Sequence, residues 1–163
     1  MFYRALRYVR LPIVLLALWT CLRFAVGVSG VPYAPRGNAM FSVFGLTLIS
    51  CLYFGAMSGR VGGFGWGGAA LSGALIGFAG QLFIFTATLV SYLAGIDTYF
   101  THWDALNIPE GTTATMAQAM GARTGGLVAG TIAGTLFALV GRLLAKLAPQ
   151  PAAAPEAVPA VAD

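Results

Sequence analysis

The chain has 163 residues, of which 58% are hydrophobic and only 9% are charged, and its mean hydropathy is +0.82. Soluble globular domains carry about 25% charged residues, so this composition excludes an ordinary soluble domain and predicts an all-α integral membrane protein. The net charge of +4 comes from basic residues beside apolar segments, which indicates contact with the lipid bilayer and argues against a nucleic-acid partner.

The N-terminal part of the chain joins basic residues to a first apolar segment at 11–31. Three arginines come just before it: Arg4, Arg7 and Arg10. This pattern is typical of a membrane span that begins on the cytoplasmic side, although a secretory signal peptide has the same basic start and apolar core. Because Arg23 interrupts the segment and no clean A-x-A cleavage site follows it, we favour a span and keep the signal peptide as the alternative.

A second apolar segment, residues 38–58, follows a turn that contains two prolines and a glycine, residues that end helices. Small side chains recur every four residues along this segment and form one column: Thr47, Cys51, Gly55 and Gly59. Such a column allows another helix to approach closely. The two cysteines, Cys21 and Cys51, are not spaced as C-x-x-C, so the sequence predicts neither a disulfide framework nor a zinc site.

The third apolar segment, residues 68–96, is the longest and carries no charge. About 20 residues are enough to cross the hydrocarbon core, so this segment has length to spare. Four small residues lie on one ridge of the expected helix: Gly65, Ala69, Gly73 and Gly77. Gln81 continues the ridge, and an amide within the membrane needs a hydrogen-bond partner inside the protein. We therefore expect the ridge and the intramembrane polar residue Gln81 to face other helices.

The connection at 97–121 is polar, acidic and aromatic. It contains the single histidine, His102, together with Asp104 and Glu110. These three titratable residues are spread along the loop, and no second histidine completes a metal site or an acid–base site. The sequence therefore predicts no catalytic residue, no cofactor site and no metal site.

The fourth apolar segment, residues 124–144, has the densest pattern of small residues. Ahead of it, Thr115 and Gln118 have the spacing of a capping box, which marks the start of a helix. One column of the segment consists of Gly126, Gly130, Gly134 and Ala138, and the neighbouring column of Gly125, Ala129 and Ala133. Two adjacent columns of this kind predict close contact with another helix, for which the third segment is suited.

The basic residues predict the topology of a four-helix, glycine-rich transmembrane domain at 1–147. With four spans, six of them fall on one side of the membrane: Arg4, Arg7, Arg10, Arg60, Arg142 and Lys146. Only Arg36 and Arg123 fall on the other side. Because loops rich in Lys and Arg stay in the cytoplasm, we expect both termini there and the loop 97–121 outside. Residues 148–163 are nearly all alanine, proline and valine and predict a disordered cytoplasmic tail.

Arg23 is the only charge well inside an expected span, where an unpaired guanidinium costs about 3 kcal/mol or more. Its side chain can snorkel to the outer headgroups, or it can form an ion pair with a carboxylate at the outer end of the bundle. Asp97, at the end of the third segment, is the first candidate partner. Asp104 is the second, and Gln81 is a neutral alternative.

Every expected span carries a column of small residues, which is more packing surface than one four-helix bundle needs. This favours a protein that acts by helix packing and is not an enzyme: an accessory, scaffold or assembly subunit, either as a homo-oligomer or with other membrane subunits. The scarcity of lysine favours a bacterial inner membrane. The alternative is a small transporter or channel component with a polar path along the third span: Gln81, Thr86, Thr88, Ser91 and Tyr92. No carboxylate lies within a span, whereas ion-coupled carriers generally use one.

Overall fold

The structure, a computed structural model, describes residues 1–29 and 42–148. Within these ranges the chain forms helices and turns without a strand, so the expected all-α fold is confirmed for them. Three helices are long and apolar enough to cross a membrane: α2 (Arg10–Val28), α4 (Trp66–Ala94) and α6 (Met116–Leu147). The shorter elements are α1 (Phe2–Tyr8), α3 (Val43–Met57), the 3₁₀ turn η2 (Tyr99–Thr101) and α5 (Trp103–Leu106).

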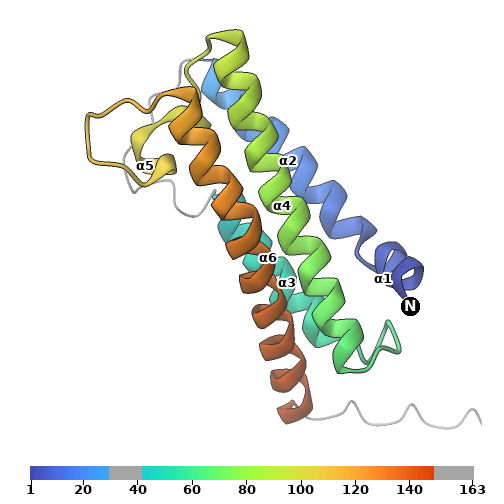
Figure 1. Ribbon diagram of the computed structural model, residues 1–163. Helices are drawn as coiled ribbons and strands as arrows, with labels where there is room; N and C mark the ends of the chain where they lie inside the picture. Colours follow the sequence, from blue (N-terminus) through green and yellow to red (C-terminus); the bar gives the residue numbers. More distant parts are fainter. Residues whose placement is uncertain (30–41, 149–163) are drawn as a thin grey trace, which may run out of the picture.

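The antiparallel helices α4 and α6 make the most extensive helix contact of the bundle (Figure 1). Gly73 of α4 lies against Gly134 of α6, and Gly77 lies against Gly130. A Cβ atom on Gly134 would lie 2.6 Å from the carbonyl oxygen of Gly73, and one on Gly77 would lie 2.5 Å from the carbonyl oxygen of Gly130. Real Cβ atoms do not approach a backbone oxygen so closely, so the two helices touch backbone to backbone and these positions accept only glycine.

α3 packs against both members of this pair. Along α6, its neighbours follow in the same order as its own residues: Cys51 lies beside Gly134, Gly55 beside Ala138, and Ser58 beside Arg142. α3 therefore runs parallel to α6 and antiparallel to α4. The contact with α4 follows from the same column, since Thr47 lies against Gly80 and the Cys51 thiol contacts the carbonyl oxygen of Gly73, with Sγ and O 3.6 Å apart.

α2 runs in the same direction as α4, on the side of the bundle away from α6 (Figure 1). Ahead of α1 and α2, Met1 lies close to Gly67 near the start of α4. At the end of α2, the ring of Phe24 stacks on Phe100, just past the end of α4, with the centroids 6.5 Å apart. Because α2 and α4 point the same way, the chain has to return between them, and α3 makes that return.

The helix ends differ from the expected spans by a few residues. α4 is two residues ahead of the expected span 68–96 at both ends, and it stops where Gly95 turns into the left-handed conformation, with φ +63°, a common end for a helix. α6 begins well before residue 124, because the capping box is present: the Gln118 amide nitrogen donates to the Thr115 hydroxyl, and the Thr115 amide nitrogen donates to the Gln118 side chain.

α3 is the element that differs most from expectation. The expected span covers residues 38–58, whereas the helix has 15 residues and begins after Ser42, whose hydroxyl accepts from the Gly45 amide. Fifteen residues extend about 22 Å, less than the roughly 30 Å of the hydrocarbon core. Residues 38–41 lie outside the described residues, as does the expected tail from residue 149 on.

Candidate functional site

The two ends of the bundle have different chemistry, and we name them by their connections. At the loop end, residues 95–115 join α4 to α6; at the turn end, residues 58–65 join α3 to α4. All three acidic residues in the described part of the chain belong to the loop end: Asp97, Asp104 and Glu110. At the same end, the connecting loop makes polar contacts with the interior of the bundle.

Arg123, near the start of α6, makes three hydrogen bonds at the loop end. Its Nε donates to the hydroxyl of Thr88 on α4 over 3.0 Å. Its Nη1 donates to the carbonyl oxygen of Ala105 over 3.0 Å, and its Nη2 to that of Phe100 over 3.1 Å. Charge-assisted hydrogen bonds are about twice as strong as neutral ones, so one side chain joins α4, η2 and α5 to α6.

The loop itself is fixed to α4 by hydroxyl groups. The buried Ser91 and Thr98 hydroxyls lie 2.7 Å apart and share a hydrogen bond. Thr98 caps η2, with Thr101 completing a capping box, and Phe100 beyond it is only 1% exposed. The first part of the expected loop 97–121 is therefore folded back onto the bundle.

Arg23 has an aromatic partner, whereas the sequence leaves open snorkelling or an ion pair with a carboxylate. Its side chain is buried at 7% exposure, and its guanidinium carbon lies 4.2 Å from the centroid of the Tyr99 ring. Two of its nitrogens, Nε and Nη2, are buried without a hydrogen-bond partner. Asp97 is exposed, so the structure places Tyr99, and not Asp97, against the guanidinium. Tyr99 reaches Arg23 because the chain turns after Gly95. This turn brings η2, and with it the ring of Tyr99, back to α2.

We expect a double-mutant cycle to find Arg23 coupled to Tyr99. Combining Arg23→Leu with Tyr99→Leu should give a coupling free energy of about 1 kcal/mol, the usual size of a partly desolvated cation–π contact. Tyr99→Phe keeps the ring face and should preserve most of the effect of Arg23. Combining Arg23→Leu with Asp97→Asn should be additive. Thermal unfolding in detergent measures all the variants, and coupling to Asp97 with additivity at Tyr99 would reverse this assignment.

A polar cavity of about 230 Å³ lies beside these groups. Its lining includes Arg123 and Asp104, together with Tyr99, Phe100 and the first residues of α3. Asp104, the second candidate partner of Arg23, thus borders the same cavity as Arg123. The cavity has the size of a few water molecules and carries groups of both charges.

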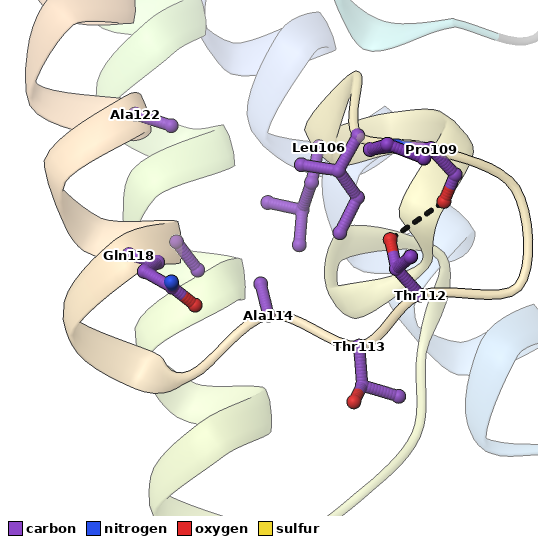
Figure 2. Close-up of a pocket in the computed structure, with 9 residues that line it drawn as sticks. Leu106, Pro109, Thr112, Thr113, Ala114, Gln118 and Ala122 are labelled. Atoms are coloured by element: carbon purple, nitrogen blue, oxygen red, sulfur yellow. Dashed lines mark hydrogen bonds between the residues drawn. The ribbon is translucent and has the colours of Figure 1, made fainter.

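A second cavity, of about 400 Å³, separates the loop from the first turns of α6 (Figure 2). Its lining is mostly apolar, and two of its three polar side chains are already engaged: Thr112 donates to the Pro109 carbonyl over 2.6 Å, and Gln118 accepts from the Thr115 amide nitrogen over 2.9 Å. The nearby His102 accepts from the Asp104 amide through Nδ1 and thereby caps α5. Within residues 1–29 and 42–148, no group of three His, Cys, Asp or Glu side chains could hold a metal ion.

Gln81 continues the glycine ridge of α4 and packs against the small residues of α6. The Gln81 side chain is 8% exposed and lies against Gly126 and Gly130, so closely that a Cβ atom on Gly130 would overlap it. Gly73 and Gly77 continue the same contact, as described above. Gly65 differs, because it precedes the first turn of α4 and nothing lies within 4 Å of the Cβ position there.

Comparison with known proteins yields no relative: the chain matches no protein-family model, no curated protein and no solved structure. A function therefore has to be inferred from the contacts above. Arg123 and Tyr99 are the residues that sequence reasoning missed as structural contacts. Arg123 and its partner Thr88 are 35 positions apart, and its other two acceptors are backbone carbonyls, for which no residue type is diagnostic.

Proposed function

We propose that the protein crosses the membrane four times with both termini in the cytoplasm, in a bacterial inner membrane. The directions of the helices support four crossings, because α3 runs back between the parallel helices α2 and α4. The charges support the orientation, since the basic residues gather at the turn end and the acidic ones at the loop end. A reporter fused after Asp163 that is active only outside the cytoplasm would contradict this topology.

We further propose that the protein acts by helix packing, as an accessory, scaffold or assembly subunit of a membrane complex. The observation that carries this proposal is a second column of small residues on α6: Gly121, Gly125 and Ala129, all exposed. Nothing lies within 4 Å of the Cβ positions of Gly121 and Gly125. The neighbouring column of α6, with Gly130 and Gly134, is filled by α4 and α3. The bundle therefore uses one small column of α6 and leaves the other facing outwards.

The burial of α6 agrees with this proposal. In the most apolar 18-residue window of α4, 44% of the residues are buried, compared with 22% in that of α6. An outward column of small residues on a helix in lipid lets a second helix approach closely, and close approach is what drives helix association where lipid and side chains are equally apolar. The open column is therefore suited to another copy of this chain or to a helix of another membrane subunit.

A transporter or channel component stays the alternative, and the contacts of α4 favour it less. Three polar residues of the suggested path have partners within the bundle. Gln81 packs against Gly126, Thr88 accepts from Arg123, and Ser91 shares a hydrogen bond with Thr98. Such contacts stabilise the packing of α4. They leave these side chains less suited to line a path for a solute.

Gly125→Leu tests the packing proposal. Gly125 is exposed, and nothing lies within 4 Å of its Cβ position, so we expect the melting temperature of the isolated protein to stay close to the wild-type value. The open column would be blocked, so co-purification of partner subunits, or the dimer seen by cross-linking, should fall at least tenfold. Val140→Leu is the matched control, since Val140 is also exposed on α6 but lies outside the small column. Wild-type assembly in Gly125→Leu would count against the proposed role.

A further inference from the structure

The turn end is strongly basic and carries no carboxylate in the described part of the chain. Six basic residues belong to it: Arg4, Arg7, Arg10, Arg60, Arg142 and Lys146. All but Arg142 are exposed. Tyr8 also stays neutral there, because burial, and then the neighbouring Tyr53, raise its pKa to about 12. Among residues 1–29 and 42–148, no carboxylate therefore balances the positive charge of this end.

Two of these cations lie on one aromatic ring. The guanidinium carbon of Arg142 lies 5.6 Å from the centroid of Trp66, and Nζ of Lys146 lies 4.9 Å from it. Arg142 is held in this position by Ser58, whose hydroxyl accepts from Nη1 over 3.0 Å. The turn approaches so closely that a Cβ atom on Gly59 would lie 2.6 Å from the same nitrogen. We call this group, Arg142, Lys146 and Trp66 with Ser58 and Gly59 of the turn, the basic notch.

The notch gathers like charges that repel one another. Arg142 and Lys146 are four residues apart on α6, a spacing at which like charges destabilise a helix. Arg60, which is exposed, follows Ser58 by two positions and adds a cation to the same turn. Buried within the notch, Nε of Arg142 has no hydrogen-bond partner. An anion with several acceptor oxygens would relieve the repulsion and accept from these donors.

The surroundings of the notch are apolar. Leu147 is 76% exposed, Val61 68% and Leu143 50%, and they flank Arg142, Lys146 and Arg60 in the sequence. Trp66 is itself 42% exposed, and tryptophan is enriched at the level of lipid headgroups. On the other side of the turn end, the short helix α1 exposes Phe2, Tyr3 and Leu6 beside its arginines, as a helix that lies in the membrane interface does.

We infer that the basic notch binds the phosphate of an anionic phospholipid, whose acyl chains lie against the exposed apolar residues beside it. Arg142 and Lys146 contact the phosphate, Trp66 keeps the two cations side by side, and Arg60 adds charge from the turn. The apolar surroundings argue for a lipid headgroup over free phosphate. This site depends neither on a partner subunit nor on the proposed role in assembly.

The test uses the full chain in detergent and native mass spectrometry with added phosphatidylglycerol or phosphatidylcholine. We expect phosphatidylglycerol to bind more tightly. Each cation near a lipid surface contributes about 1 kcal/mol, so Lys146→Gln should weaken that binding about fivefold, and Lys146→Gln with Arg142→Gln about thirtyfold. Arg7→Gln removes one charge from the same end of the protein but not from the notch, and should change the affinity for the bound lipid by less than twofold.

Lys146→Gln keeps the test independent of folding, because Lys146 is exposed, whereas Arg142 also bonds to Ser58. Trp66→Leu should weaken phosphatidylglycerol binding as well, since it removes the ring that holds both cations. Equal binding of the two lipids, or equal losses in Lys146→Gln and Arg7→Gln, would overturn the inference. If inorganic phosphate competes at the same concentration as the lipid, the notch is a site for the free anion and the lipid assignment is wrong.

Discussion

Gly134→Ala should destabilise the folded protein by about 3 kcal/mol, although it adds only one methyl group. The new Cβ atom would lie 2.6 Å from the carbonyl oxygen of Gly73 and 2.9 Å from Cα of Gly77. Both are backbone atoms, so no side chain can rotate away, and α4 and α6 would have to separate. Overpacking a filled interior costs about 1–3 kcal/mol, and a backbone clash belongs at the upper end. Thermal unfolding in detergent, followed by circular dichroism, measures the loss.

The same substitution at Gly125 is the matched control. Gly125 is on the same helix, and nothing lies within 4 Å of its Cβ position. Gly125→Ala should therefore leave the protein as stable as before, or more stable by up to about 1 kcal/mol, because alanine favours a helix over glycine. If both substitutions lower the melting temperature equally, the contact between α4 and α6 does not depend on the absence of a side chain at 134.

The helices were predictable because long apolar segments and glycine spacing are local properties of the sequence. The expected span 68–96 differs from α4 by two residues at each end, and the capping box at Thr115 and Gln118 marks the true start of α6. The expected span 124–144 is shorter than α6 because it counts only the most apolar residues. Helix geometry continues beyond them to Leu147, since a helix does not have to end where the apolar segment does.

The polar contacts of the loop end were not predictable in the same way. A charge inside a span predicts that a partner exists, but not which one, because several residues 70 or more positions away are equally suitable. Tyr99 reaches Arg23 only through the left-handed turn at Gly95 and the cap at Thr98. In the sequence, Tyr99 has the pattern of an aromatic residue at the membrane interface. Whether Asp97 or Tyr99 contacts Arg23 therefore depends on where the fold places each residue, and not on the residue type.

Gly55 and Gly141 also show that the sequence does not determine which helices come into contact. The sequence places Gly55 in a column of small residues, but it does not show which helix faces that column. The structure places Gly55 against the backbone of Ala138 and Gly141 against that of Leu52. α3 therefore uses its glycine against α6, and one helix, α6, packs on both α3 and α4. Spacing predicts a close contact, whereas the choice of neighbour depends on all the helices together.

Arg123→Leu should release the loop from the bundle and lower the stability by about 3 kcal/mol. Hydrogen bonds to a charged group contribute about 1.5–3 kcal/mol each, and this side chain makes three of them. Leucine removes the cost of burying the guanidinium, which offsets part of the loss, but it leaves the carbonyl oxygens of Phe100 and Ala105 without their donor. Thr88 is affected less, because its hydroxyl also donates to the Ile84 carbonyl over 2.8 Å.

In Arg123→Leu, the loss of stability should affect the loop end before it affects the rest of the bundle. Amide hydrogen exchange in residues 98–107 should accelerate strongly in Arg123→Leu, whereas exchange at the turn end of α6 should stay as in the wild type, because Arg123 joins only the loop end. Arg123→Lys keeps the charge, but one ammonium group cannot reach three acceptors so far apart, so it should restore little of the protection. Thr124→Val, at the neighbouring exposed position, should behave as the wild type. Full protection of the loop in Arg123→Leu would mean that the hydroxyl contact between Ser91 and Thr98 holds it without the arginine.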